Sequence, residues 1–312
     1  MNYTEEAAVF PCEGRSLIGV LARPEVPQDI GMVVIVGGPQ YRAGSHRQFV
    51  LLSRALAAAG FSVLRFDYRG MGDGEGAQRD FESVSADVAA AIGVLQAKIP
   101  TVKRLALWGL CDGASAALLY CQETQDTRVT GLCLLNPWVR SEAGLAKTQV
   151  KHYYTQRLRQ KEFWLKLLSG KVAFGALGGF IQKVRTIAAG NRESAATAAE
   201  PFQRRMAHGW NGFAGSVMLV LSGDDYTAKE FLEHITTDLA WKDWQSRPNL
   251  IRYDLPGTDH TFSDAVSRQK VEDLTAAWAH MLASDQSFHD NGQTIKVFLK
   301  CPHSVCARAV RS

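Results

Sequence analysis

The stretch W-G-L-C-D-G-A-S at residues 108–115 decides the fold. An apolar run that predicts a buried strand precedes it, and the small residues that follow it predict a helix. A strand that enters a helix through G-x-nucleophile-x-G forms a tight turn, called the elbow. The turn is so tight that the residues two before and two after the nucleophile must be small. Gly109 and Gly113 occupy those positions, so the pattern predicts that Cys111 is the nucleophile. The alternative is a buried cysteine without a chemical role.

A thiol nucleophile needs a base, and His260 is the candidate. It lies in L-P-G-T-D-H-T-F-S at 255–263, after the last expected strand and before the last expected helix. A thiol at a helix N-terminus next to a histidine reacts as the thiolate near neutral pH. The pattern therefore favours a cysteine–histidine pair.

An acid that orients the histidine is expected after the apolar run 217–222, since this places nucleophile, acid and histidine in that chain order. Two adjacent acids follow Gly223 there. We favour Asp225, because the second acid points inward when the turn begins at the glycine, and Asp224 remains the alternative. At the end of the preceding strand, where an acid could serve instead, stands Asn136.

The oxyanion formed by acyl transfer needs backbone donors. One is expected from the N–H of Asp112, directly after the nucleophile. The other is expected from G-G-P-Q at 37–40, and because Pro39 has no N–H, Gln40 is the favoured donor. The Asp112 side chain is assigned no proton-transfer role.

Strand and helix patterns alternate along the chain, which predicts an α/β fold with a mostly parallel eight-stranded sheet and helices on both faces. Ligands of such sheets bind at the carboxyl ends of the strands. The expected strands are 7–12, 16–22, 32–37, 62–66, 104–108, 130–135, 216–222 and 249–254. The expected helices are 46–59, 81–98, 113–123, 226–242 and 264–283.

The alternation stops at 138–210, where apolar residues at helical spacing predict a helical cap. The core would then comprise 1–137 and 211–284, and 285–312 would be a flexible tail. Between 140 and 192 stand eleven basic and two acidic residues, an excess of nine positive charges. This segment is either a solvated helix face or a surface for an anionic substrate, carrier or membrane.

Composition narrows the function classes further. The chain has 312 residues, 46% hydrophobic and 21% charged, with a net charge of +4. These values predict an ordinary globular protein, and we expect no nucleic-acid partner. The polar start and the absence of a long apolar run favour a cytoplasmic protein, as do the scattered cysteines. Cys301, His303 and Cys306 match no common closed zinc site, so neither a metal nor a cofactor is expected.

These residues together resemble the α/β-hydrolase superfamily, including F-D-Y-R-G-x-G at 66–72. The resemblance covers about residues 1–284. Within the superfamily, V-G-G-P-Q-Y-R-A-G-S-H-R at 36–47, the elbow at 109–115 and L-S-G-D-D-Y-T-A-K-E-F at 221–231 look like the exosortase A-associated hydrolase 1 family. That likeness implies a bacterial protein encoded near exopolysaccharide and protein-sorting genes.

The predicted function is hydrolysis of an ester, thioester or lactone through a triad of Cys111, His260 and Asp225, with an acyl-enzyme intermediate. One alternative is acyl transfer to another acceptor by the same triad. A second is a non-catalytic accessory protein with a hydrolase-like fold.

Overall fold

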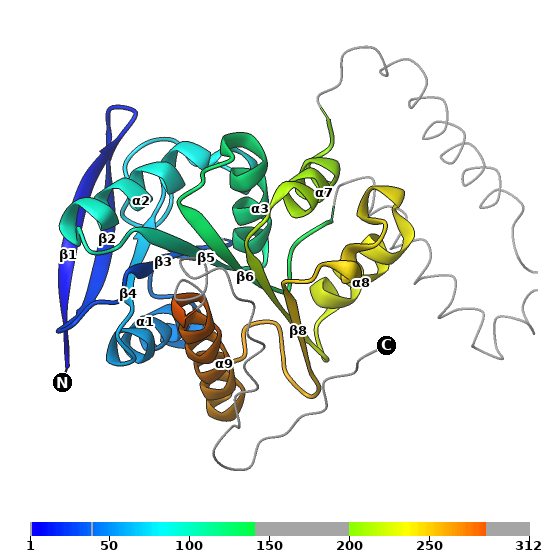
Figure 1. The fold of residues 1–312 in the computed structure, drawn as a ribbon. Helices are drawn as coiled ribbons and strands as arrows, with labels where there is room; N and C mark the ends of the chain where they lie inside the picture. Colours follow the sequence, from blue (N-terminus) through cyan, green and yellow to red (C-terminus); the bar gives the residue numbers. More distant parts are fainter. Residues whose placement is uncertain (1, 39, 141–199, 285–312) are drawn as a thin grey trace, which may run out of the picture.

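The computed structural model describes residues 2–38, 40–140 and 200–284 (Figure 1). Within them, eight strands form one sheet in the order β1-β2-β4-β3-β5-β6-β7-β8. The first two strands run antiparallel to their neighbours, and the other pairs are parallel, as expected. The strands are β1 (Tyr3–Cys12), β2 (Arg15–Pro24), β3 (Ile30–Ile35), β4 (Ser62–Asp67), β5 (Arg104–Leu110), β6 (Val129–Leu135), β7 (Ser216–Ser222) and β8 (Leu250–Leu255).

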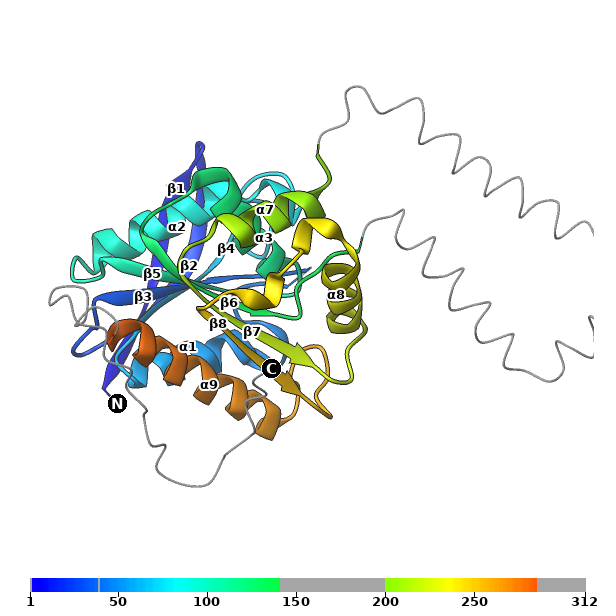
Figure 2. The ribbon, with the colours of Figure 1, turned by 45° about the vertical axis from the view of Figure 1, so that its right-hand side comes forward.

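Helices cover both faces of the sheet. Figures 1 and 2 show α1 and α9 on one face and α2 and α3 on the other. Every residue of β3 and β4 is buried as a result, which explains why central strands read as continuous apolar runs. The described helices are α1 (Gln48–Ala58), α2 (Ser85–Lys98), α3 (Asp112–Thr124), α7 (Phe202–Gly212), α8 (Tyr226–Thr237) and α9 (Ala265–Ser284), with short 3₁₀ turns η1 (Ser45–Arg47), η2 (Phe81–Ser83), η3 (Leu239–Trp241) and η4 (Trp244–Ser246).

Three expected helices are shorter in the structure. The helix expected at 81–98 begins at Ser85, because the separate turn η2 occupies Phe81–Ser83 before it. The helix expected at 46–59 begins at Gln48, because His46 and Arg47 have φ of 52° and 59°, which an α-helix cannot contain. The helix expected at 226–242 ends at Thr237. Asp238 then caps η3 by accepting a hydrogen bond from the Ala240 amide, which starts a new turn.

Helix α7 falls largely inside the range 138–210 that was expected to form the cap. It packs directly on α3, and a Cβ at Gly209 would lie 2.2 Å from the carbonyl oxygen of Leu118. Its position therefore continues the layer of helices over the sheet. The rest of the expected cap, at 141–199, and the expected tail at 285–312 lie outside the described residues.

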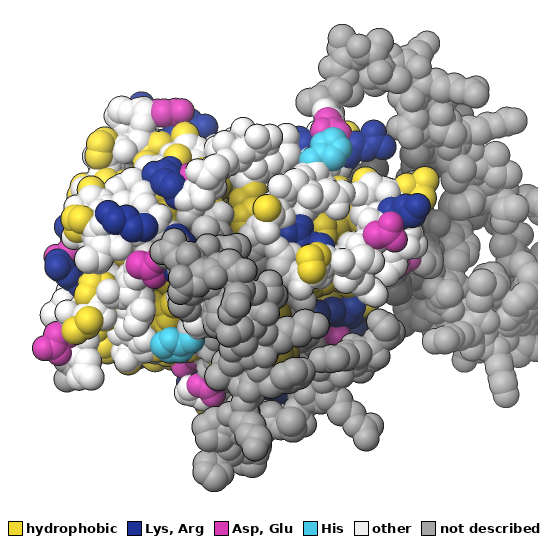
Figure 3. Space-filling view, viewed as in Figure 1, with side chains coloured by type: hydrophobic (Ala, Val, Ile, Leu, Met, Phe, Trp, Pro, Cys, Tyr) yellow, Lys and Arg dark blue, Asp and Glu magenta, His cyan; other side chains and the backbone are white. Residues whose placement is uncertain are grey.

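The surface of the core carries charges of both signs. On the face in Figure 3, Lys and Arg side chains are interspersed with Asp and Glu and do not gather on one element. In the described ranges, no helix has both the length and the apolar character that a membrane span requires.

Candidate active site

Cys111 lies in the tight turn between β5 and α3. Its φ of 61° and ψ of −128° place a non-glycine residue in a strained conformation, as is common at functional sites. A Cβ at Gly109 would lie 2.4 Å from the backbone of Gly113, and a Cβ at Gly113 would lie 2.4 Å from the carbonyl oxygen of Ile35. Both positions therefore require glycine, which is the reason the motif was recognisable in the sequence.

His260 lies in the loop between β8 and α9, and Asp225 follows β7. The Nδ1 atom of His260 is 2.8 Å from Oδ2 of Asp225. The Asp225 carboxylate is also the N-cap of α8, where it accepts hydrogen bonds from the amides of Thr227 and Ala228, both at 3.1 Å. Asp224 is exposed, and only its backbone amide is held, by the carbonyl of Thr258 at 3.0 Å. The structure thus brings Asp225, and not Asp224, onto the histidine.

The electrostatics of this group favour a charged histidine. Hydrogen bonds to Asp225 and to Cys111 raise the pKa of His260 to about 10, against the opposing effect of burial. Burial disfavours the charged form of Asp225, but the hydrogen bonds from His260 and from two amides outweigh it and hold its pKa below the ordinary value. The arrangement can hold an imidazolium between a carboxylate and a sulfur.

Asn136 holds the histidine loop in place. Its side chain is fully buried, and its Nδ2 donates to the carbonyl oxygen of His260 at 3.1 Å and to Oγ of Ser222 at 2.9 Å. The Ser222 hydroxyl in turn donates to the carbonyl oxygen of Asp259 at 2.9 Å. The sequence indicates no such role for Asn136 beyond placing a polar residue at the carboxyl end of a buried strand.

The loop after β3 meets the elbow through a side chain. The amide of Gly38 donates to Oδ1 of Asp112 at 2.5 Å. In the same loop, the Oε1 atom of Gln40 accepts a hydrogen bond from the Ser45 amide at 3.1 Å. The backbone of Asp112 directly follows the nucleophile, as the sequence requires. The oxyanion roles of Gln40 and Asp112 remain predictions, and Pro39 lies outside the described residues.

Two buried carboxylates fix the neighbouring rim loops. Asp67, at the end of β4, accepts hydrogen bonds from the amide of Arg42 at 2.6 Å and from its guanidinium. The guanidinium of Arg69 donates to Asp87 of α2 at 2.9 and 2.7 Å. These ion pairs hold the loops around the F-D-Y-R-G-x-G motif in place, which is a structural role.

Among the described cysteines, Cys111 alone is partly exposed. Cys12, Cys121 and Cys133 are free and buried. Burial raises the pKa of the Cys121 thiol to about 12 and that of Cys133 well above its ordinary value. A reagent in solution therefore meets Cys111 first among these four thiols.

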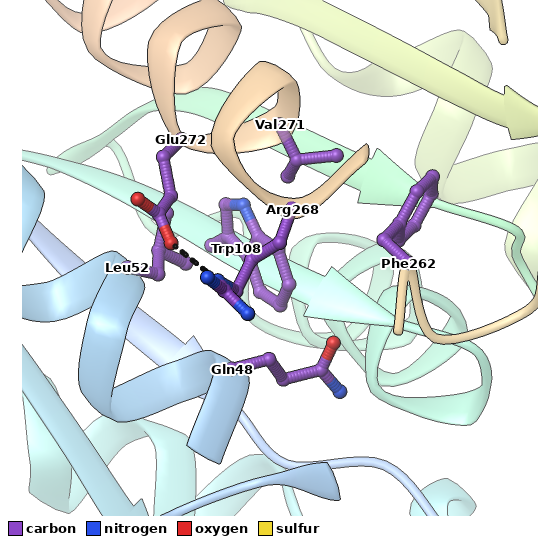
Figure 4. Close-up of a pocket in the computed structure, with 7 residues that line it drawn as sticks. All are labelled: Gln48, Leu52, Trp108, Phe262, Arg268, Val271 and Glu272. Atoms are coloured by element: carbon purple, nitrogen blue, oxygen red, sulfur yellow. Dashed lines mark ion pairs between the residues drawn. The ribbon is translucent and has the colours of Figure 1, made fainter. Parts of the chain in front are cut away.

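A small, mostly apolar cavity lies between α1, β5 and α9, on the side of the sheet opposite α3 (Figure 4). Its volume is about 10 Å³. Among the described residues, Gln48 Nε2 and Trp108 Nε1 are buried without a hydrogen-bond partner, and Glu272 Oε1 lies 3.5 Å from Nε of Arg268 in an ion pair. The cavity is lined by Gln48, Leu52, Trp108, Phe262, Arg268, Val271 and Glu272. It is far too small for a substrate. Over the described ranges, no three His, Cys, Asp or Glu side chains are grouped as a metal would require.

Comparisons with known proteins agree with this architecture. The family model described as serine aminopeptidase, S33, matches residues 28–176, just under half of the chain. None of the curated protein sequences matches this chain.

Solved structures match over most of the chain. The esterase Pf2001 of Pyrococcus furiosus is 16% identical, with a TM-score of 0.58 over 89% of this chain and 93% of its own. Est1E of Butyrivibrio proteoclasticus, solved with ferulic acid, is 13% identical, with a TM-score of 0.56 over 88% and 98%. A dienelactone hydrolase of Anabaena variabilis is 12% identical, with a TM-score of 0.56 over 90% and 99%. These neighbours show that the chain has the α/β-hydrolase fold, and the family match supports a hydrolase.

Proposed function

We propose that the protein is an acyl hydrolase in which Cys111 is the nucleophile, His260 the acid–base group and Asp225 the residue that orients the imidazole. The single observation that carries the proposal is the position of His260. Its Nδ1 lies 2.8 Å from Asp225, and its pKa is raised both by Asp225 and by the side chain of Cys111 in the strained elbow. A triad is recognised by such geometry and roles, whatever its place in the sequence.

The first half of the reaction acylates the enzyme. The Cys111 sulfur, as a thiolate paired with the His260 imidazolium, attacks the acyl carbon, and a C–S bond forms. The acyl oxygen becomes an oxyanion, which the amide hydrogens of Asp112 and Gln40 are expected to hold. When the oxyanion collapses, the bond to the leaving alcohol or thiol breaks, and the imidazolium donates its proton to that leaving group.

The second half releases the acid. Neutral His260 takes a proton from water as the water oxygen attacks the thioester carbon, and the thiolate leaves as the C–S bond breaks. The His260 imidazolium that results pairs again with the thiolate. Asp225 stays ionised throughout, since its lowered pKa keeps it charged, and it fixes which ring nitrogen faces the sulfur.

The substrate class follows from the thiolate. A thioester intermediate forms easily from esters, thioesters and lactones, and amides would suit this nucleophile less well. From its resemblance to the exosortase A-associated family, we propose an acyl group connected with bacterial exopolysaccharide and a cytoplasmic site of action. The basic segment 140–192 is proposed to meet an anionic substrate, carrier or membrane surface.

The test is hydrolysis of a series of p-nitrophenyl esters and acyl thioesters. We expect turnover by the wild type, none above background by Cys111→Ala, and nearly full turnover by Cys121→Ala, which removes a buried thiol from the same helix. Equal turnover by Cys111→Ala would refute the nucleophile. Product appearing only when an alcohol acceptor is added would indicate acyl transfer, and inactivity on the whole series would favour the accessory role.

A further inference from the structure

The Asp112 carboxyl group lies where backbone amides converge. The amide of Gly38, 74 positions away in the sequence, donates to its Oδ1 at 2.5 Å. The amides of Gly113 and of Asp112 itself also form hydrogen bonds with the carboxyl group. A Cβ at Gly37 would lie 2.3 Å from the same Oδ1, so the loop after β3 rests directly on this side chain. Asp112 is therefore the contact that holds the loop against the elbow.

In the proposed reaction the acyl oxygen is expected to bind beside this carboxyl group. In the proposed reaction, the amide of Asp112 and the loop at 37–40 supply the donors for the oxyanion. An ionised Asp112 holds the amide hydrogens of Gly38, Gly113 and its own residue with its charge, and it repels a second negative charge beside it. A neutral Asp112 can still accept from Gly38 through its carbonyl oxygen, and its hydroxyl becomes a donor.

The surroundings of Asp112 have opposing effects on its pKa. Burial raises the pKa of Asp112, while the amides and the charge of His260 oppose that rise. Tyr68, at the end of β4, also faces it. The Tyr68 side chain is 3% exposed, and its own pKa is raised by burial and by the charge of Asp112. On balance the site retains the Asp112 proton to a higher pH than an exposed carboxyl group would.

We propose that Asp112 is a positioning residue of the acylation step, which holds the loop at 37–40 through Gly38 and admits the acyl oxygen only in its neutral form. The proposal rests on the proposed function, since it needs an acyl group on Cys111. It adds a carboxyl group whose ionisation slows acylation through the oxyanion site, beside its weaker charge interaction with His260.

The test compares acylation with alkylation of the wild type, Asp112→Asn, Asp112→Ala and the exposed control Asp224→Asn, from about pH 5 to about pH 9. Acylation is measured as the burst of p-nitrophenol, and alkylation as the rate of Cys111 labelling by iodoacetamide, which needs no oxyanion site. Asparagine keeps an acceptor for Gly38 and cannot ionise, whereas alanine loses both properties.

We expect the ratio of acylation rates, Asp112→Asn over wild type, to rise with pH, approaching about tenfold per pH unit above the Asp112 pKa. The alkylation ratio should change with pH far less than the acylation ratio. Asp112→Ala should acylate more slowly than Asp112→Asn at every pH, and Asp224→Asn should follow the wild type. An acylation ratio that does not change with pH would overturn the inference and leave the proposed function standing. Absence of any acylation in the wild type would refute the proposed function, and this inference with it.

Discussion

Replacing Asp225 with asparagine separates the two roles of this carboxylate. It caps α8 through two amides and orients His260 through Oδ2 at 2.8 Å. Asparagine is as good an N-cap as aspartate, so the change in unfolding free energy should stay within about 1 kcal/mol. The contact to His260 changes from a charge-assisted hydrogen bond to a neutral one, and asparagine can favour the wrong imidazole tautomer.

The expected catalytic loss is much larger than the stability loss. In a Ser–His–Asp triad the corresponding change costs about 10,000-fold in turnover, or about 5 kcal/mol of transition-state stabilisation. We expect Asp225→Asn to approach that loss in kcat/KM. Because Asp225 is the largest cause of the raised His260 pKa, the variant should also lose its imidazolium well below the wild-type value of about 10.

The assay is kcat/KM on a p-nitrophenyl ester for Asp225→Asn and the matched variant Asp224→Asn, with urea unfolding of both. The exposed neighbour should behave as the wild type. A loss smaller than about tenfold for Asp225→Asn at unchanged stability, or a larger loss for Asp224→Asn, would refute the reasoning.

Three further outcomes follow from the charges. In Asp112→Asn, which removes the ionisation proposed above, turnover should fall about tenfold per unit above about pH 10, since an imidazole without its proton cannot protonate the leaving group. A limb near pH 7 in the pH–rate profile of that variant would contradict the pairing of His260. Burial raises the pKa of Glu272, so the folded state binds this proton more tightly than the unfolded state, and stability is lost as pH rises through the raised pKa of this carboxyl group. Glu272→Gln should remove that loss in urea titrations, whereas Glu25→Gln, at an exposed site, should retain it. If the basic segment 140–192 captures an anionic partner, binding to anionic vesicles or kcat/KM for an anionic acyl substrate should weaken as salt rises past about 0.15 M, and no change would leave this segment a solvated face.

The elbow was predictable because steric demands appear in the sequence. A Cβ at Gly109 or at Gly113 would lie 2.4 Å from a backbone atom, so no other residue type fits at either position. The strands were predictable for a related reason, since a sheet covered on both faces needs continuous apolar runs. The helix starting at Gln48 was placed two residues too early, because nothing local in the sequence signals the left-handed conformations of His46 and Arg47.

The supporting contacts of the site were not predictable, because they join residues that are far apart in the chain. The hydrogen bond from Gly38 to Asp112 spans 74 positions, and that from Asn136 to His260 spans 124. Only the register of β3, β5, β6 and β7 brings these loops to one edge. The preference for Asp225 over Asp224 agrees with the observed contact to His260, because a helix N-cap turns its side chain back toward the start of the helix.

The central claim is that Cys111 carries the acyl group. Its most direct test is rapid acid quenching of the protein during turnover of a p-nitrophenyl ester, followed by mass spectrometry of the intact chain and of its peptides. We expect one acyl group on the peptide that contains Cys111, its disappearance on a chase with water, and no adduct in Cys111→Ala. Turnover with no adduct on Cys111, or with the acyl group on another residue, would contradict it.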